Sequence, residues 1–561
     1  MSAIAMLLVG LGALALGYRF YSKFLAERIF RLDPEFATPA HTLRDGVDYV
    51  PTNRFVLWGH HFTSVAGAAP IVGPAIAVIW GWGPAFAWVI LGTIFFAGVH
   101  DFGALWASVR SKGKSIGMLS GSYIGRRGRN LFLVVIFLLL LMVNAAFAVV
   151  ISNLLVSTPT SVIPVWGAIA VALVIGQLIY RYHVGLLWPS VGGVIALYAL
   201  ILIGSMYPIV LPDAVFGLGA KSVWILLLFL YAGIASLLPV WVLLQPRDYI
   251  NGLQLFIGLG IIYAAVLIAS PDVVAPAFNT GLPANTPSIV PLLFVTIACG
   301  AISGFHGMVA SGTTSKQLDK ETDGRFVGYF GSVGEGMLSL AAIICCTAGF
   351  ASLVEWQAVY SAFGSGNVTA FVNGGQALLT SGLGLPANLG ATVLATMAIL
   401  FAATTMDTGV RLQRFVIQEA GELSGFKVNT MVGTLAALAS CLALAFGAGA
   451  DGSGGMLIWP LFGTTNQLLA ALTLAIISVI LIRLGRNAIY TIVPLCFLLL
   501  MSLYALVVQL GSFYASGNWL LLGMDVVILV AALWVTLEAV MAMRKGREGA
   551  SQGGRAEAEE G

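Results

Sequence analysis

Apolar runs of about 20 residues recur along the whole chain, and this is the length that a helix needs to cross the hydrocarbon core of a bilayer. Of the 561 residues, 59% are hydrophobic and 9% are charged, whereas about 25% of the residues of a soluble globular domain are charged. We therefore predict an all-α polytopic membrane protein with about 15 transmembrane helices. The predicted spans are residues 2–24, 55–79, 82–109, 130–156, 163–180, 189–208, 220–243, 249–270, 289–313, 326–350, 387–405, 428–447, 456–482, 488–509 and 518–542.

Lysine and arginine set the expected orientation, because the cytoplasmic loops of membrane proteins are enriched in both. When the basic end of the chain is placed in the cytoplasm, alternation over the predicted spans puts every Lys and Arg inside except Lys221. The outward loops at 271–288 and 351–386 carry neither residue type. We thus expect the N-terminus outside and the C-terminus inside, in the cell (inner or plasma) membrane. The basic residues form no extended patch, so no nucleic-acid partner is expected.

Two distant segments share a Gly-x-His pattern. The first runs from Gly59 to Pro70 and the second from Gly304 to Thr314, and the pattern G-x-H-x5-G-[AT]-[AT] coincides without a gap. The predicted spans that carry it cross the membrane in opposite directions, as in the inverted repeats of secondary transporters. Small residues and histidines in such spans favour interrupted helices, whose freed backbone groups must face protein or a water-filled cavity. The pattern therefore predicts a binding site made by both segments.

Further short motifs occur in the order seen in a known family. They are Gly81-Trp82-Gly83-Pro84, Gly98-Val99-His100-Asp101, Gln245-Pro246-Arg247-Asp248-Tyr249, Ser311-Gly312-Thr313-Thr314-Ser315-Lys316, Thr404-Thr405-Met406-Asp407-Thr408 and Trp459-Pro460-Leu461-Phe462-Gly463. Together with the two Gly-x-His segments, they make the chain resemble the carbon starvation protein A family over nearly its whole length. The resemblance implies a LeuT-type inverted-repeat core of five plus five helices with extra helices. It also implies uptake of pyruvate or short peptides, the former coupled to protons. An inverted repeat of seven plus seven helices would give the two Gly-x-His segments the same opposite directions across the membrane.

On this basis the chain divides into six parts. These are residues 1–54, the first span and a cytoplasmic loop; 55–208, the first half of the core; 209–288, an inserted helix pair; 289–482, the second half of the core; 483–543, peripheral helices; and 544–561, a disordered cytoplasmic tail.

Small and hydroxyl-bearing residues in the two Gly-x-His segments are the candidates for substrate binding. Half-helix N-termini carry partial positive charge and can hold a carboxylate, and a histidine in a membrane span can pair with a carboxylate or relay a proton. Close helix packing by small residues is the alternative explanation, and a neutral histidine bonded to a carbonyl is another. The candidates are His61, Thr63, Ser64, Gly67, Ala68, His306, Ser311, Gly312, Thr313 and Thr314.

Acids and hydroxyls within the predicted spans are the candidates for ion or proton coupling: Asp101, Glu335, Thr404, Thr405 and Asp407. Buried carboxylates take up protons readily because burial disfavours their charged form. The resemblance also implies membership of the amino acid–polyamine–organocation transporter superfamily. In that superfamily, two adjacent hydroxyls at the position of Thr404 and Thr405 bind sodium. Alternatively, Asp407 pairs with Arg411 four residues on, and Asp101 simply bonds His100. Arg247 and Asp248 are expected to form a structural pair at the cytoplasmic face.

We therefore expect a secondary active transporter that imports short peptides or pyruvate, driven by a proton or sodium gradient, with no cofactor and no bound metal. The expected partners are the small-molecule substrate and the lipid bilayer, and the sequence leaves the oligomeric state open. Two alternatives are a nutrient sensor with a transporter fold and a redox or metal protein ligated by His60, His61, His100 and His306. The five cysteines lie in apolar runs without C-x-x-C spacing, and no motif of a soluble enzyme occurs.

Overall fold

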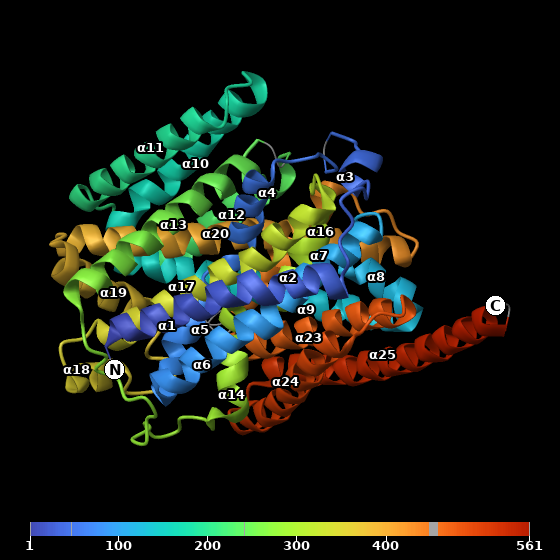
Figure 1. Ribbon diagram of the computed structural model, residues 1–561. Coiled ribbons are helices and arrows are strands. Elements are labelled where there is room, and N and C mark those ends of the chain that lie inside the picture. Colours follow the sequence, from blue (N-terminus) through green and yellow to red (C-terminus); the bar gives the residue numbers. More distant parts are fainter. Residues whose placement is uncertain (1, 47, 240–241, 448–457, 560–561) are drawn as a thin grey trace.

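The computed structural model describes residues 2–46, 48–239, 242–447 and 458–559. Helices form a single bundle (Figure 1), and the only strands in these ranges are a short antiparallel pair, β1 (Ala214–Val215) and β2 (Leu218–Gly219). Helices dominate because the backbone groups of an apolar segment must be satisfied within the segment when it lies in a membrane.

Twelve helical segments of the described chain are long and apolar enough to cross a membrane. They are Ala3–Ile29 (α1 and its continuation through α2, Ser22–Phe24), Trp82–Arg110 (α6, Trp82–Gly92, and α7, Gly98–Arg110), α9 (Arg126–Ser157), Pro159–Ile179 (around α10, Val162–Gly176), α11 (Leu187–Met206), α12 (Ala220–Leu237), α13 (Leu244–Ala269), Glu321–Ala348 (containing α17, Phe330–Ala348), α20 (Ala387–Leu423), α23 (Trp459–Arg483), α24 (Ile489–Ala515) and Trp519–Lys545 of α25.

One further span is bent: α4 (Arg54–Ala66) and α5 (Ala69–Ala77) meet at an angle of 43° and bring the count to 13. This number is lower than the predicted 15. The predicted span 289–313 is divided into α14 (Ile289–Thr296), α15 (Ala298–Ala301) and α16 (Gly304–Gly312), and α21 (Thr430–Phe446) is shorter than a full span. Hydropathy alone does not register such breaks. The orientation of the termini depends on the count of 15 and stays a prediction.

Within the described residues, four shorter helices lie in the connections: α3 (Pro39–Thr42), α8 (Ile116–Tyr123), α18 (Leu353–Val359) and α19 (Val368–Leu383). The long predicted loop at 351–386 thus contains two helices, and α19 packs against α13, α17 and α20.

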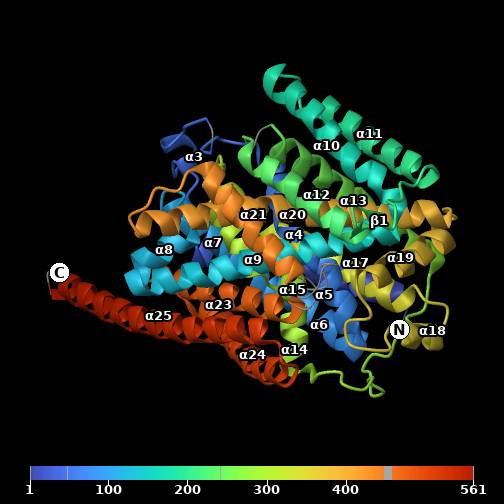
Figure 2. The ribbon, with the colours of Figure 1, turned by 180° about the vertical axis from the view of Figure 1, so that it is seen from behind.

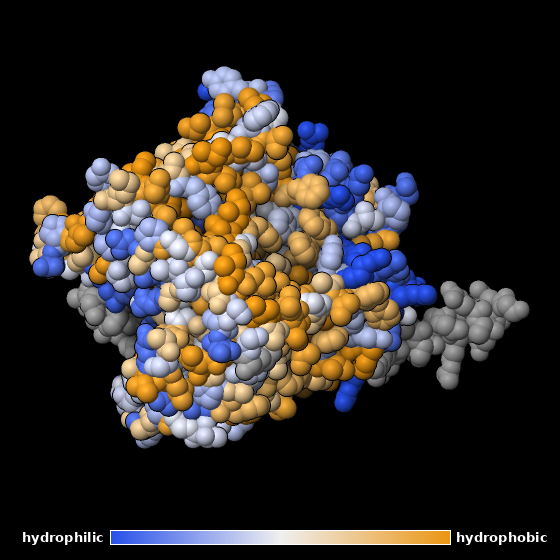
Figure 3. All heavy atoms as spheres, turned by 60° about the vertical axis from the view of Figure 1, so that its left-hand side comes forward, coloured by the Kyte–Doolittle hydropathy of each residue, from blue (hydrophilic) through white to orange (hydrophobic). Residues whose placement is uncertain are grey.

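The bundle has a buried centre and a lipid-facing periphery. Every residue in the apolar stretch of α23 is buried, compared with one third of those in α11 and α25. Figure 3 shows a broad apolar surface across the middle of one face, with hydrophilic residues gathered toward its margins. Together with the membrane-length helices, this surface confirms the prediction of a multi-pass membrane protein.

The predicted division of the chain, including an inserted pair at residues 209–288, stays a prediction. Within that segment, α13 packs against α4 and α20, and α12 packs against α9, α20 and α21. The pair at the edge is α10 with α11, which lies along one side of the bundle in Figures 1 and 2. At the other end, the backbone of α25 stays helical through Glu559, so no break marks the predicted boundary at residue 543. No proline lies beyond it to stop the helix.

Candidate functional site

The first helix break lies between α4 and α5, at Gly67. Its φ of +54° is in the region that favours glycine, and an added Cβ would lie 2.8 Å from both the Phe147 ring and the Thr405 hydroxyl. The break takes away the helical partners of the Thr63 and Ser64 carbonyls. Two hydroxyls of α20 replace them: Thr404 donates to the Thr63 carbonyl at 3.1 Å and Thr405 to the Ser64 carbonyl at 3.2 Å.

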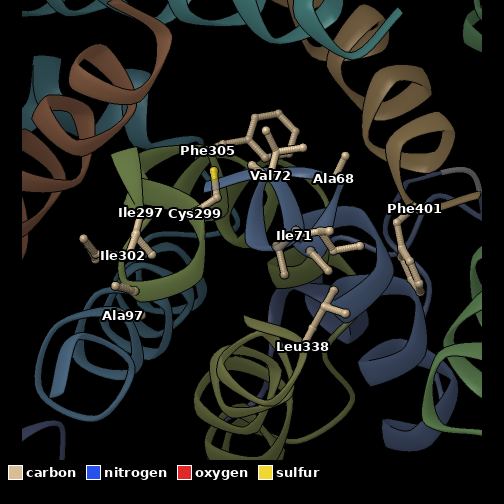
Figure 4. Packing of buried hydrophobic residues seen from close by; sticks show 14 of the residues in the cluster. Ala68, Ile71, Val72, Ala97, Ile297, Cys299, Ile302, Phe305, Leu338 and Phe401 are labelled. Carbon is tan, nitrogen blue, oxygen red and sulfur yellow. The ribbon is translucent and has the colours of Figure 1, made fainter. Parts of the chain in front are cut away.

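The second break lies between α15 and α16, where Ile302 and Ser303 are extended. Asn466 of α23 caps the new helix: its side-chain oxygen accepts the Phe305 N–H at 2.9 Å, and its nitrogen donates to the Ser303 hydroxyl at 3.0 Å. The two broken helices are neighbours, since α15 packs on α5. In Figure 4, Ala68, Ile71 and Val72 lie close to Phe305 and Cys299. The two interrupted helices therefore face each other inside the bundle.

The Gly-x-His pattern does not mark equivalent places in the two helices. Gly67 comes well after Gly59 at the end of α4, whereas the second break comes just before Gly304. The second glycine of the pattern ends a helix in both copies, since Gly67 follows the last residue of α4 and Gly312 is the last residue of α16. Ser311, Gly312, Thr313 and Thr314 thus lie at a helix C-terminus, which carries partial negative charge and disfavours a carboxylate. Sequence alignment alone could not detect this shift.

The second break places one predicted histidine among the predicted coupling acids. His306 Nδ1, in the first turn of α16, is 2.8 Å from Asp101 Oδ2, and His306 Nε2 is 3.1 Å from Glu335 Oε2 without hydrogen-bond alignment. On the other side of Asp101, the His100 Nδ1 is 2.7 Å from Oδ1, and Ser332 donates to Oδ2 at 2.5 Å. We call these five residues the His306 cluster. All five are buried.

The His306 cluster joins three helices, α7, α16 and α17, through two acids and two imidazoles. A buried charge is costly unless it is paired, and imidazole exchanges protons near neutral pH. Protonation or deprotonation of this cluster therefore changes which side chains can stay paired across the three helices. The sequence predicted Asp101, Glu335 and His306 separately, and Ser332 was not predicted, because a lone serine in an apolar helix carries no distinguishing signal.

A second charged cluster lies beside α4. Asp248 of α13 receives a hydrogen bond at 2.8 Å from the adjacent Arg247 Nη2 and lies 2.9 Å from the His60 Nδ1. The Nη1 atom of Arg247 bonds Asp407 of α20 and the Tyr231 hydroxyl of α12. We call these five residues, all in the interior, the Arg247 cluster.

The Arg247 cluster bears on two predictions. Arg247 and Asp248 form the predicted pair, and both side chains are buried. The alternative in which Asp407 pairs with Arg411 is wrong, because its partner is Arg247 and the Arg411 guanidinium donates to the Ala235 and Leu238 carbonyls. Charged residues had placed the predicted start of this span at residue 249, whereas α13 begins at Leu244.

The remaining candidates have other contacts. His61 Nδ1 lies 2.9 Å from the Thr314 hydroxyl. The Thr63 hydroxyl donates to the Gly59 carbonyl at 2.7 Å and to the Asp248 carbonyl at 3.1 Å, and the Ser64 hydroxyl points at Asp248 Oδ2 at 3.4 Å. His60 pairs with Asp248, while His100 and His306 pair with Asp101, so the four histidines do not converge on one ligand set.

Ser311 and Gly312 line a cavity of about 310 Å³ together with Met308. Its charged lining residues are Asp48, Lys114, Lys316 and Glu419, from segments that the sequence predicts to be cytoplasmic. Tyr49 also lines it, and burial together with the Asp48 and Asp45 carboxylates raises the pKa of its phenol, so the phenol stays neutral. The end of α16 is therefore reachable from this side of the protein.

Comparison with known proteins gives the family. The family model described as "Carbon starvation protein CstA" matches residues 2–352 and 348–505. The peptide transporter CstA of Campylobacter jejuni is 32% identical, with 92% of this chain and 81% of that protein covered. The pyruvate/proton symporter BtsT of Escherichia coli is also 32% identical, with 92% and 84% covered. The peptide transporter CstA of Bacillus subtilis is 30% identical, with 96% and 97% covered.

Among solved structures, a manganese transporter of Eremococcus coleocola is similar with a TM-score of 0.44 and 12% identity, covering 90% of this chain and 99% of that one. A TM-score below 0.5 does not establish a common fold. The identity with the named relatives and the match to the family model do establish common descent: this chain belongs to the carbon starvation protein CstA family.

Proposed function

We propose that this protein is a secondary active transporter that carries short peptides or pyruvate into the cell together with protons. Relatives that are about a third identical over most of their length are named as peptide transporters and as a pyruvate/proton symporter. The observation that supports the mechanism most strongly is the His306 cluster, which places two buried acids and two imidazoles directly beside a break in a membrane helix.

Coupling follows from the cost of unpaired charge inside the protein. His306 lies between Asp101 of α7 and Glu335 of α17, and it sits on the short helix that begins at the break. A proton that binds this cluster neutralises one acid and weakens its hold on His306, so that α16 is free to move against α7 and α17. Loss of the proton restores the pairing. Binding of the proton to the His306 cluster thus determines whether α16 can move.

The first break provides the substrate site in this proposal. α5 begins at Ala69, directly after Gly67 and Ala68, and the partial positive charge of a helix N-terminus favours an anionic substrate near this break. Thr63 and Ser64 shape this site through hydrogen bonds with Asp248. The cavity at Ser311 and Gly312 is then an exit route, and its lysines Lys114 and Lys316 attract an anion leaving toward that side.

The proton is favoured over sodium as the driving ion. The Thr404 and Thr405 hydroxyls and the carbonyls they bind are the kind of oxygen set that sodium uses, but in this structure the hydroxyls donate to those carbonyls and so join α20 to α4. In contrast, Asp101, Glu335 and His306 form a set of titratable groups. No prosthetic cofactor takes part in the proposed cycle.

Uptake by purified protein in liposomes tests the proposal. Vesicles with a more acidic exterior should accumulate labelled pyruvate or a labelled di- or tripeptide, and a protonophore should abolish the accumulation. Protein-free liposomes serve as the control for passive entry. A protein that binds these compounds but moves none of them would instead be a sensor, and uptake that does not respond to the protonophore for any compound would contradict proton coupling.

A further inference from the structure

The Arg247 cluster contains one more acid than its arginine can balance. Asp248 and Asp407 both contact the guanidinium, and the side chains of Arg247, Asp248 and Asp407 are at most 2% exposed. Two carboxylates thus share one guanidinium, and the His60 imidazole lies against Asp248 alone. A buried excess charge is costly unless something compensates it. The cluster is therefore suited to bind a proton.

Two polar atoms in this cluster have no hydrogen-bond partner among the described residues. One is Oδ1 of Asp407 and the other is Nε2 of His60, and both are buried. Unsatisfied buried polar atoms are rare in proteins and call for an explanation. Here they flank the guanidinium on the α20 and α4 sides, next to the first helix break.

We propose that Arg247 is the receptor for the substrate carboxylate, and that Asp407 releases Arg247 by taking up a proton. This inference rests on the proposed transport function and names the residue that selects for carboxylates. In the substrate-free state the guanidinium is shared by Tyr231, Asp248 and Asp407. In the loaded state, protonated Asp407 turns away and the carboxylate of the substrate takes its place on Nη1. On release, the carboxylate leaves and the proton of Asp407 goes to the cytoplasm.

The number of partners on the guanidinium links the two binding events. Binding of the anion alone would bring three carboxylates to one guanidinium, and binding of the proton alone would leave only Asp248 paired with it. Binding of both restores two carboxylates, the number in the empty cluster. At this cluster, one proton therefore accompanies one carboxylate.

The geometry supports replacement of Asp407 rather than addition of a third partner. The void beside Arg247, lined by Tyr231, Leu400 and neighbouring apolar residues, has a volume of about 20 Å³, which is enough for about one water molecule. The position of Asp407 is also linked to the first break through Thr405, two residues earlier on α20. The Thr405 hydroxyl donates to the Ser64 carbonyl and would lie 2.8 Å from a Cβ added at Gly67.

The charged and titratable groups around Asp407 come from four helices. Arg247 and Asp248 belong to α13, Tyr231 to α12, His60 to α4, and Arg411 lies one turn further along α20 itself. Arg411 is held by two carbonyls and is not available to replace Arg247. Asp248 stays paired with Arg247 and His60 throughout, so Asp407 is the acid that can leave.

Substrate counterflow in proteoliposomes tests this assignment with pyruvate and dialanine as probes, each compared with its neutral amide. The wild type should exchange the carboxylates but not the amides, and its apparent affinity should rise as the pH falls, by up to about tenfold per pH unit for one linked proton. Asp407→Asn imitates the protonated acid. It should retain exchange, lose the pH dependence and lose proton-driven accumulation.

Removal of the arginine should weaken recognition of the carboxylate. Arg247→Gln alone leaves two buried acids unpaired and can impair folding, so the double variant Arg247→Gln/Asp407→Asn, which removes the ion pair, is also measured. Once shown to be folded by gel filtration and thermal melting, it should bind the carboxylates about 10- to 100-fold more weakly, as expected for a lost hydrogen bond to a charged group. Arg414→Gln is the matched control, because this buried arginine of α20 bonds the Ser236 carbonyl and hydroxyl.

The outcomes separate the two claims. A folded double variant that exchanges pyruvate or dialanine with wild-type affinity overturns the role of Arg247, and a wild-type pH profile in Asp407→Asn overturns the exchange with Asp407. A wild-type protein that exchanges neither probe would instead contradict the proposed transport function.

Discussion

The imidazole of His61 lies 2.9 Å from the hydroxyl of Thr314, so a residue of the first broken helix bonds the segment that follows the second. His61 is wholly buried on α4, and Thr314 comes directly after α16. This contact connects α4 with the segment that follows α16. Movement of one half-helix is thereby linked to the other.

His61→Leu should weaken this connection. The substitution leaves the buried Thr314 hydroxyl without its imidazole partner, which costs about 1–3 kcal/mol. Thermal unfolding in detergent should show a lower midpoint, and uptake at saturating substrate should fall. His183→Gln, at an exposed position, should change neither. An unchanged melting temperature in His61→Leu would show that the contact does not stabilise this state.

Gly67→Ala should be among the most damaging small substitutions in the chain. Alanine at a φ of +54° is strained, and its Cβ would lie 2.8 Å from the Phe147 ring and the Thr405 hydroxyl. We expect a loss of about 1–3 kcal/mol of stability and loss of uptake. Gly260→Ala on α13, where an added Cβ meets nothing within 4 Å, is the matched control. Wild-type uptake by Gly67→Ala would show that the bend is not required.

Asp101→Asn and Glu335→Gln should separate exchange from accumulation. Each substitution removes a proton acceptor from the His306 cluster while nearly preserving side-chain volume. Counterflow should persist, and accumulation driven by an acidic exterior should be lost. Asp525→Asn is the control, since Asp525 is a buried acid of α25 without hydrogen-bond partners among the described residues. Proton-driven accumulation that survives in both cluster variants would remove the cluster from the coupling mechanism.

Thr405→Val tests the role of the α20 hydroxyls. Loss of the bond to the Ser64 carbonyl should cost about 1 kcal/mol, and replacement of sodium by choline should leave wild-type uptake unchanged. Thr408→Val on the same helix should have little effect on stability, because the Thr408 hydroxyl is buried without a partner among the described residues. Uptake that requires sodium in the wild type and loses this requirement in Thr405→Val would assign the hydroxyls to a sodium site.

The sequence predicted the first helix break correctly because Gly67 carries a local signal. The second break was not located from the sequence, since Ile302 and Ser303 include no glycine or proline. The shared Gly-x-His pattern then suggested an equivalence that the helices do not have. Local composition therefore locates a break only where glycine or proline is needed to make it.

Long-range pairing accounts for most of what the sequence could not show. Asp101, Glu335 and His306 were predicted one by one, but their contacts join segments that are far apart in the chain. Arg247 was placed outside its span because a charged residue lowers hydropathy, even though Asp248 and Asp407 compensate that charge in the interior. Buried ion pairs of this kind become visible only when the helices are assembled.

The most direct test of the account is the pH inside proteoliposomes while substrate enters. Vesicles loaded with a pH-sensitive dye should acidify on addition of external pyruvate or dialanine at equal pH on both sides, beyond the signal of protein-free vesicles. Asp101→Asn should not acidify. Entry of labelled substrate through the wild-type protein with no change in internal pH would contradict the account.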